Sequence, residues 1–468
     1  MLEFKPIQTR SAARLRKYYE QCTYRLCEYS VGVKLMWREH FHPQYAEACG
    51  CLIVLNRSRH LGHIFDYPVP LPGEGDVDAA LDAIDAWCME RGTAPIFGVV
   101  PEEERDVLLD RYPFVSLENG RVWQDYLYRA EDLASFAGRR YSGQRNHINK
   151  FRKLYPSAVF RPLTEADGEA LEAFWEEFHL DFHKENAEAR REACSARKMT
   201  RQIGKQKWIK AGAMELDGRF IAISLAEVCG DTLVCHIEKA LSQYEGVYPA
   251  IVQAFAACYG EGLTWINRED DAGDRGLRTS KLQYLPAAMG AKLQMVVRNE
   301  LDSLKEIPAL RSGRLTLDGL REEDRAAYNR LCLDDGRNRW WGYDYREDLK
   351  GELTEDYFLE TARRDFANKL AVNFAVRLDG QLIGEAVLYR FDYRGQAELG
   401  CRILPEYAGS GYGREAFRTA AEWSLYSLGL RRLTAKCYHE NLASARMLES
   451  CMRSCGEDGM FRYFEKKV

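Results

Sequence analysis

The sequence lacks a long apolar run. No stretch of about 18 or more apolar residues occurs, so no transmembrane helix is expected. Residues 1–20 lack the apolar core of a signal peptide, and we therefore expect a cytoplasmic protein without membrane insertion. Excess positive charge is missing as well. The net charge of −5 argues against a globally basic nucleic-acid binder, although local basic patches stay possible.

Metal-binding motifs are also missing, although the chain has 14 cysteines. It has no Cys-x-x-Cys pair, and the closest pairs, Cys49/Cys51 and Cys451/Cys455, do not have the usual zinc spacing. His179 and His183 are four residues apart and would share a helix face, but no third ligand accompanies them. We predict reduced, mostly buried thiols and no metal site.

What the chain does have is length and an internal repeat. Its 468 residues, 46% of them hydrophobic and 29% charged, predict two or three folded domains. Segments 212–240 and 371–403 each show an alternating strand, a Leu-Asp-Gly turn and two further strands, and 49–66 is a poorer version. With the helical patterns around them, these meanders predict an α/β protein with mixed sheets. We expect domain boundaries near 135–155 and near 300–313, where "SLKEIPALRSGRL" loses periodicity.

The stretch "PEYAGSGYGREA", residues 405–416, places three glycines at alternating positions before a predicted helix over 411–428. Glycines let the backbone N–H groups approach a ligand closely, and a helix N-terminus carries partial positive charge. The pattern therefore favours a cradle for a pyrophosphate. A plain corner between a strand and a helix is the alternative, because such corners are common.

The wider order of residues resembles the GNAT acetyltransferase family over about 310–468. Pro405, Glu406 and Tyr407 precede the glycines, Glu415 and Ala416 follow them, and Asn441 and Ser444 come later. The resemblance implies acetyl-CoA as co-substrate and an amine of a small molecule or peptide as acceptor. It also implies the following cofactor contacts: Ile403 and Leu404 with the pantetheine arm, the N–H groups of Gly409, Ser410, Gly411, Tyr412, Gly413 and Arg414 with the pyrophosphate, and Asn441 further along. Ala408 departs from the family, which usually has Arg or Gln there.

Acyl transfer to an amine needs a proton acceptor for the amine and a hydrogen-bond donor near the thioester. The position where many relatives have a tyrosine falls near Met447, which cannot donate. Tyr438 and Ser444 are the candidate donors, and Glu398 or Glu385 is the candidate base. For each of these, a strand residue that faces solvent is the alternative.

An aromatic stretch, "NRWWGYDYRED" at 338–348, falls in the region that covers the acceptor site in GNAT proteins. Trp340, Trp341 and Tyr343 are therefore candidates for the acceptor site. The alternative is a pair of tryptophans packed in the core.

Two charged stretches stand out in the first 300 residues. Segment 138–153 has six cationic and no acidic residues, among them Arg139, Arg140 and Arg145, which favours contact with the phosphates of a nucleotide, CoA or RNA. A solvated helix face is the alternative. The loop after the predicted strand at 263–267 gathers Asn267, Arg268, Arg278 and Lys281, which predicts either a binding site or a salt-bridged loop.

These stretches resemble the soluble family related to the C-terminal domain of phosphatidylglycerol lysyltransferases, over roughly 1–300. The likeness rests on "YSGQRNHINKF", "HIEKA", "YPAI" and "INREDDAGDRGLRTSK". It implies a tandem pair of GNAT folds, similar to Fem-type aminoacyltransferases, and hence three GNAT-like units over 1–135, 136–302 and 310–468. No glycine-rich loop follows the second meander, so acetyl-CoA is expected at the C-terminal unit rather than in the N-terminal pair.

The resulting hypothesis is an acyltransferase whose C-terminal unit acetylates an amine. Its N-terminal pair would transfer an acyl or aminoacyl group to an unknown substrate. Two alternatives stay open: an aminoacyl-tRNA-dependent aminoacyltransferase, or catalytically inactive GNAT folds that sense a ligand.

Overall fold

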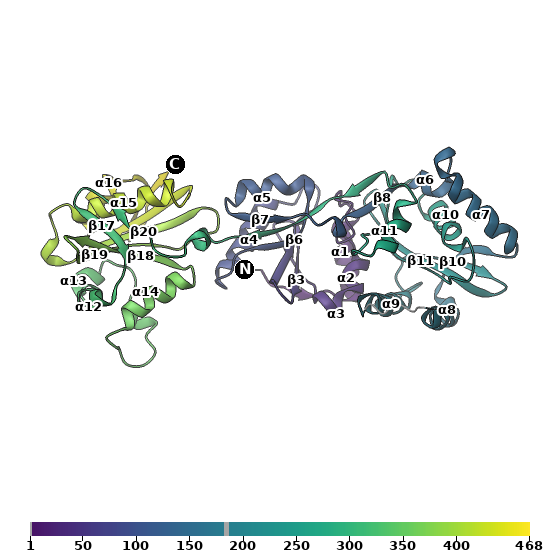
Figure 1. Ribbon diagram of the computed structural model, residues 1–468, viewed down its shortest axis with the longest axis horizontal. Coiled ribbons are helices and arrows are strands. Elements are labelled where there is room, and N and C mark those ends of the chain that lie inside the picture. Colours follow the sequence, from purple (N-terminus) through teal and green to yellow (C-terminus); the bar gives the residue numbers. More distant parts are fainter. Residues whose placement is uncertain (1, 182–186) are drawn as a thin grey trace. The chain divides into compact units, whose positions relative to one another are not determined.

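The structure is a computed structural model that describes residues 2–181 and 187–468. Two compact units make up the chain (Figure 1). One comprises residues 1–106 and 117–296, and the other comprises residues 107–116 and 297–468. The first unit is built on two sheets and the second on a sheet of its own. The predicted mixed α/β class is therefore confirmed.

The first sheet has the strand order β1-β2-β3-β4-β6-β15-β7, with β5 paired to β3. Its strands are β1 Lys5–Pro6, β2 Gln44–Ala48, β3 Cys51–Ser58, β4 Gly62–Asp66, β5 Val69–Pro70, β6 Ile96–Pro101, β7 Val115–Glu118 and β15 Lys292–Val297. The helices of this segment are α1 Ala12–Tyr19, α2 Val31–Met36, α3 Arg38–Phe41, α4 Val77–Met89 and α5 Arg105–Arg111.

The second sheet has the order β14-β8-β13-β12-β11-β10-β9. Its strands are β8 Asp125–Arg129, β9 Val159–Pro162, β10 Lys210–Leu216, β11 Arg219–Cys229, β12 Thr232–Ala240, β13 Trp265–Asn267 and β14 Ala288–Gly290. The helices are α6 Ala130–Ser135, α7 Ser142–Leu154, α8 Gly168–Asp181, α9 Ala187–Thr200, α10 Val247–Tyr259 and α11 Arg275–Leu282. Side chains of α6, α7 and α10 form the core on one face of this sheet.

The first two sheets exchange strands. β8 precedes residue 135 but pairs with β13 and β14 of the second sheet. β15 follows almost all of the second sheet in sequence, and it returns to pair antiparallel with β6 of the first sheet. Each sheet therefore contains a strand from the other side of the predicted division at 135–136.

The third sheet has the order β16-β17-β18-β19-β20-β21-β23-β22. Its strands are β16 Leu310–Arg311, β17 Leu315–Gly319, β18 Ala371–Leu378, β19 Gln381–Tyr389, β20 Gln396–Ile403, β21 Arg432–Tyr438, β22 Arg453–Glu457 and β23 Phe461–Lys467. Its helices are α12 Arg325–Cys332, α13 Asp335–Asn338, α14 Tyr357–Ala367, α15 Tyr412–Tyr426 and α16 Leu442–Glu449. Helices α15 and α16 pack on one face, and α12 and α14 belong to a separate cluster with other strand residues.

Local sequence signals account for several of these elements. The turns at Asp217-Gly218 and Asp379-Gly380 have positive φ at both residues, which is why Asp and Gly suit them, and the predicted hairpins are confirmed. The helix predicted over 411–428 is α15, and its apolar residues Phe417, Ala421 and Leu425 are buried. β22 is a strand that the sequence patterns did not predict.

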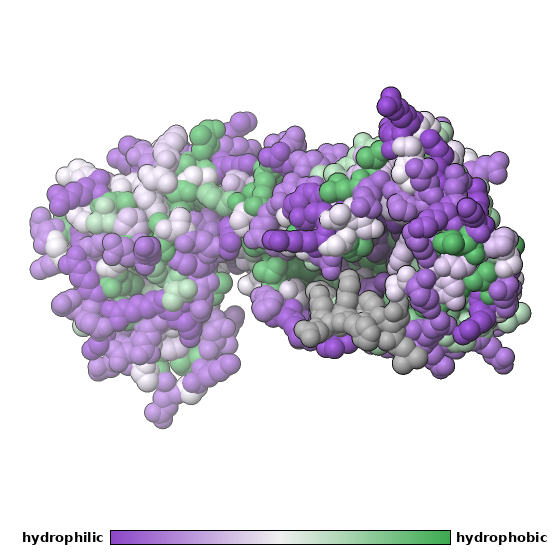
Figure 2. Space-filling view, turned by 45° about the vertical axis from the view of Figure 1, so that its right-hand side comes forward, coloured by the Kyte–Doolittle hydropathy of each residue, from purple (hydrophilic) through white to green (hydrophobic). Residues whose placement is uncertain are grey.

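The surface agrees with the absence of apolar runs. No helix among the described residues has both the length and the apolar character needed to cross a bilayer. On the face that Figure 2 shows, hydrophobic residues lie in small patches between hydrophilic ones.

Candidate functional site

The two central parallel strands of the third sheet separate part-way along their length. β20 and β21 pair at only three positions, from Gln396↔Arg432 to Glu398↔Thr434. β20 then continues to Ile403, still paired on its other side with β19, while β21 continues to Tyr438. Backbone groups on one edge of β20 are thereby left open to an extended ligand. Ile403 and Leu404, the predicted pantetheine contacts, lie at the open end.

The glycine-rich turn follows β20 and leads into α15. Gly409 and Gly411 have φ angles of 80° and 82°, and Gly411 is the N-cap of the helix. A Cβ atom on Gly409 would meet nothing within 4 Å, so this side of the turn is open. The first N–H groups of α15 have no partner inside the helix and favour an anion. The predicted cradle, from Gly409 to Arg414, therefore has the backbone form that the sequence indicated.

Arg314, which the sequence patterns did not single out, contacts this turn. Its Nη1 donates to the carbonyl oxygen of Ser410 at 3.1 Å, and its guanidinium lies 4.5 Å from the ring centre of Tyr412. Nothing in the local sequence indicates a contact between residues 96 positions apart.

The aromatic stretch at 338–343 meets both separated strands. The ring of Trp341 lies against Gly400 and under the guanidinium of Arg402, 4.4 Å from its centre. Trp340 contacts Tyr438, with 5.8 Å between ring centres. The two tryptophans therefore lie beside the opening rather than in the core. Tyr343 is exposed and donates to Asp348 at 2.9 Å.

Arg402 fixes the position of this aromatic stretch. Its Nε donates to Glu385 Oε1 at 2.5 Å, and its Nη1 donates to Asn338 Oδ1 at 2.8 Å. Glu385 is buried, and its other oxygen accepts the hydroxyl of Tyr328 at 2.8 Å. Glu385, the alternative candidate base, thus has both oxygens engaged in holding Arg402 and Tyr328.

The candidate catalytic residues do not all share one face. Glu398 and Tyr438 project from the same face, since Glu398 pairs with Thr434 and side chains alternate along a strand. Glu398 accepts from Tyr389 at 2.7 Å through Oε1 and from Arg390 at 2.9 Å through Oε2, so both of its oxygens are engaged, as those of Glu385 are.

Ser444 belongs to the other face. It interacts with Cys437, whose side chain points opposite to that of Tyr438. Asn441 caps α16 by accepting the N–H of Ser444 at 3.1 Å. The structure therefore separates the two candidate donors, Tyr438 and Ser444.

In the N-terminal unit, the predicted polar loop is held from within. Asn267 is fully buried and donates to Asp125 at 2.8 Å, and Arg268 donates to Glu238 at 2.7 Å. Lys281 donates to the carbonyl oxygen of Arg268 at 2.6 Å. Arg278 forms two bonds with the buried carboxylate of Asp271, at 2.8 and 2.9 Å, and is the most accessible of the four predicted residues.

The predicted basic stretch forms the start of α7 and the turn before it. Arg140 is paired with Asp132 at 2.7 Å, and Arg145 donates to the carbonyl oxygens of Phe136 and Gly138. Arg139 is exposed and has no ion pair with any residue that the structure describes. Gln144 of α7 donates to the carbonyl oxygen of Gln283, just beyond the polar loop, at 3.0 Å.

Two histidines of this unit lie in different surroundings. His236 lies between Glu227 and Glu269, with 2.9 Å to each. Although burial opposes its charge, these two carboxylates raise the pKa of His236 to about 9. His179, of the pair considered as metal ligands, lies against Trp175, and His183 lies outside the described residues.

Known families match both parts of the chain. Residues 19–294 match the family described as phosphatidylglycerol lysyltransferase, C-terminal, and residues 314–451 match the acetyltransferase (GNAT) domain. The first match covers more than half of the chain. The chain belongs to the phosphatidylglycerol lysyltransferase C-terminal family. It joins the fold of that family to a GNAT acetyltransferase domain, as the sequence resemblances implied.

Individual proteins agree with both matches. The chain is similar to two uncharacterized N-acetyltransferases of Bacillus subtilis (strain 168). YnaD is 30% identical over 115 residues, 23% of this chain and 68% of YnaD, and YoaA is 24% identical over 144 residues, 30% of this chain and 80% of YoaA. A conserved protein of unknown function from Bacteroides thetaiotaomicron VPI-5482 has 26% identity and a TM-score of 0.56, covering 63% of this chain and 99% of that one.

These findings confirm that the chain is an acyltransferase. The GNAT domain implies an acyl-CoA as co-substrate and an amine as acceptor.

The lysyltransferase-family region repeats the strand separation without the open turn. β12 and β13 pair at three positions, from Thr232↔Trp265 to Val234↔Asn267, as β20 and β21 do. Gly246, the N-cap of α10, has a φ of 81°, but a Cβ there would lie 2.5 Å from the carbonyl oxygen of His147 on α7. Helix α7 thus covers the place where the C-terminal domain has its open glycine turn.

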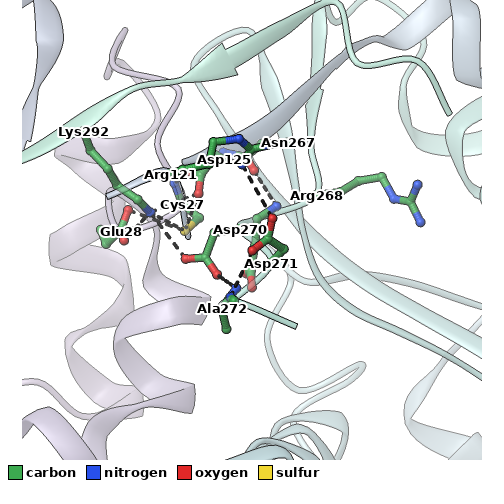
Figure 3. Close-up of polar contacts among 12 residues, drawn as sticks. Cys27, Glu28, Arg121, Asp125, Asn267, Arg268, Asp270, Asp271, Ala272 and Lys292 are labelled. Atoms are coloured by element: carbon green, nitrogen blue, oxygen red, sulfur yellow. Dashed lines mark hydrogen bonds and ion pairs between the residues drawn. The ribbon is translucent and has the colours of Figure 1, made fainter. Parts of the chain in front are cut away.

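Between the two sheets of the lysyltransferase-family region lies a buried charged cluster (Figure 3). Lys292 Nζ is 2.5 Å from Glu28 and 3.0 Å from Asp125, and it lies 3.8 Å from Asp270. Burial raises the pKa of Asp270 to about 6. The donor atoms of Cys27, Glu28 and Asp125 are close enough together for a metal ion, but the Lys292 ammonium already contacts all three.

Proposed function

We propose that the C-terminal domain, residues 310–468, transfers an acetyl group from acetyl-CoA to an amine of a small molecule or peptide. The observation that carries this proposal is the open strand edge of β20 leading directly into the open glycine turn. An extended pantetheine arm needs an open strand edge, and a pyrophosphate needs an open turn with free N–H groups. In the N-terminal region the second feature is missing, because α7 covers the turn at Gly246 before α10.

The acceptor amine would enter on the face that bears Trp340 and Trp341. Its nitrogen attacks the thioester carbon, the C–S bond breaks, and the ammonium proton leaves. Glu398 would accept that proton, directly or through water, and the Tyr438 hydroxyl would donate to the developing negative charge on oxygen or to the departing thiolate. Exposed Tyr343 would lie at the outer edge of the acceptor site.

On the opposite face, Ser444 and Asn441 are proposed to contact the cofactor beyond the pyrophosphate. The N–H groups from Gly409 through Ser410, Gly411, Tyr412 and Gly413 to Arg414 would hold the pyrophosphate itself.

Binding of acetyl-CoA to Gly411→Asp tests the proposal. The added carboxylate repels phosphate at the cradle, so the rise in melting temperature that acetyl-CoA gives the wild-type chain should be lost. Gly380→Asp is the matched control, because Gly380 has a φ of 84° in an open hairpin turn of the same domain. No shift of the wild-type chain at millimolar acetyl-CoA would contradict the proposed function.

For the N-terminal region we propose two GNAT-like units, 1–135 and 136–302, that exchange β8 and β15. An aminoacyl-tRNA-dependent transferase is the second candidate function. Two observations favour it. The turn at Gly246 is covered, which argues against the binding of CoA there, and the cationic side chain of Arg139 is exposed.

Filter binding of tRNA at low salt tests this second function. Arg139→Gln should weaken binding and reduce its salt dependence, whereas Arg14→Gln, an exposed arginine elsewhere in the N-terminal region, should not. Undetectable tRNA binding by the wild-type chain would contradict it.

A further inference from the structure

Arg314 and Glu415 form a clamp at the base of the glycine turn. Glu415 lies in the first turn of α15, and its Oε1 accepts from the Ser312 hydroxyl and the Arg314 backbone N–H, both at 2.7 Å. Its Oε2 accepts Arg314 Nε at 2.8 Å. Although burial opposes ionisation, these hydrogen bonds lower the pKa of Glu415. Glu415 therefore stays ionised and fixes the guanidinium plane.

The fixed guanidinium in turn holds the glycine turn. Its Nη1 reaches the Ser410 carbonyl oxygen at 3.1 Å, and its face packs on the Tyr412 ring. In a trans peptide the carbonyl and the following N–H point in opposite directions. Because the Ser410 carbonyl points at Arg314, the Gly411 N–H points away from Arg314.

We propose that Arg314 is a positioning residue for the cofactor's pyrophosphate and takes over the task of the polar arm that is missing at Ala408. This inference rests on the proposed function of the C-terminal domain. The mechanism is orientation rather than net charge, since Glu415 balances the charge of Arg314. The planar fork is essential, because it engages the Glu415 carboxylate and the Ser410 carbonyl at once, and a lysine has no such fork.

Calorimetric titration of the full chain with acetyl-CoA and with S-acetylpantetheine, which lacks the pyrophosphate, tests this role. Arg314→Gln should raise the Kd for acetyl-CoA about tenfold and leave the Kd for S-acetylpantetheine unchanged. Arg314→Lys should behave like Arg314→Gln. The matched control is Arg432→Gln, since Arg432 also pairs with a glutamate at 2.8 Å and its side chain is 40% exposed, against 49% for Arg314.

The outcomes separate this inference from the proposed function. A wild-type chain that does not bind acetyl-CoA contradicts the proposed function itself. If the wild-type chain binds acetyl-CoA and the Kd of Arg314→Gln is within twofold of the wild-type Kd, the role of Arg314 is overturned and the proposed function stands. Equally weakened binding of acetyl-CoA and S-acetylpantetheine also overturns it, because that result indicates a general loosening of the domain. Wild-type affinity in Arg314→Lys overturns it too, because that result indicates that charge alone is sufficient. In steady state, Arg314→Gln should raise the KM for acetyl-CoA and leave kcat unchanged.

Discussion

Glu300 makes the stability of the second compact unit, which comprises residues 107–116 and 297–468 and contains the C-terminal domain, depend on pH. Its side chain is buried, Oε1 accepts the N–H of Gly395 at 3.1 Å, and Oε2 has no partner among the described residues. Burial raises its pKa from the ordinary 4.5 to about 7. The folded chain therefore binds this proton more tightly than the unfolded chain does. The stabilisation is complete below pH 4.5 and is lost as the pH rises through 7.

The size of the effect follows from the two pKa values. Moving from 4.5 to about 7 corresponds to about 3 kcal/mol of lost stability at pH 8 and above. Glu300→Gln removes the titration but keeps a neutral side chain of the same shape. We expect the variant to match the wild-type chain near pH 4.5 and to exceed its stability by up to about 3 kcal/mol at pH 8.

Urea unfolding between pH 4.5 and 8, followed on the transition of the C-terminal domain, measures this difference. Comparing variant and wild type at each pH cancels the groups that titrate in both. Glu306→Gln, an exposed glutamate of the same segment, serves as control and should show no such pH-dependent gain. Parallel pH profiles for the wild-type chain and Glu300→Gln would refute the reasoning.

Three further predictions concern the two sites. Arg402→Lys loses the fork that holds Glu385 and Asn338, so Trp341 should shift and the KM for the amine should rise about tenfold, while a kinetic assay showing an unchanged KM would contradict this. Tyr438→Phe should lower kcat by roughly 10²-fold without changing the Kd for acetyl-CoA, and an unchanged kcat would remove Tyr438 from the chemistry. The pKa of His236 is raised to about 9, so the melting temperature of the N-terminal unit should fall as the pH rises from 6.5 through 9. His236→Gln should not show this fall. A wild-type melting temperature that does not change over that range would contradict the assignment.

The features that could be predicted from the sequence depend on residues close to one another in the chain. The Asp-Gly hairpins, the buried face of α15 and the glycine turn are all encoded within about fifteen residues, because turn conformation and helix periodicity are local properties. The family resemblance supplied the fold, whereas the binding of a pyrophosphate at the glycine turn stays a prediction.

Contacts between distant segments were outside the reach of such patterns. Arg314 meets Ser410 across 96 residues, and Lys292 meets Glu28 across 264. Single charged residues carry no signal of their partners, so the sequence left the polar loop at 267–281 open between a binding site and a salt-bridged loop. The contact between α7 and Gly246 could not be predicted from the sequence either, because it depends on how the two helices pack.

The exchange of β8 and β15 has a consequence for how the protein is made. The first sheet needs Lys292–Val297 to complete its pairing with β6, so a nascent chain holds an unfinished sheet, with an open strand edge, until nearly 300 residues have left the ribosome. The third sheet is built entirely from residues 310–467 and can form from one continuous segment. During synthesis, the N-terminal region is therefore the part that keeps an unpaired strand edge longest, and both of its sheets become complete almost together.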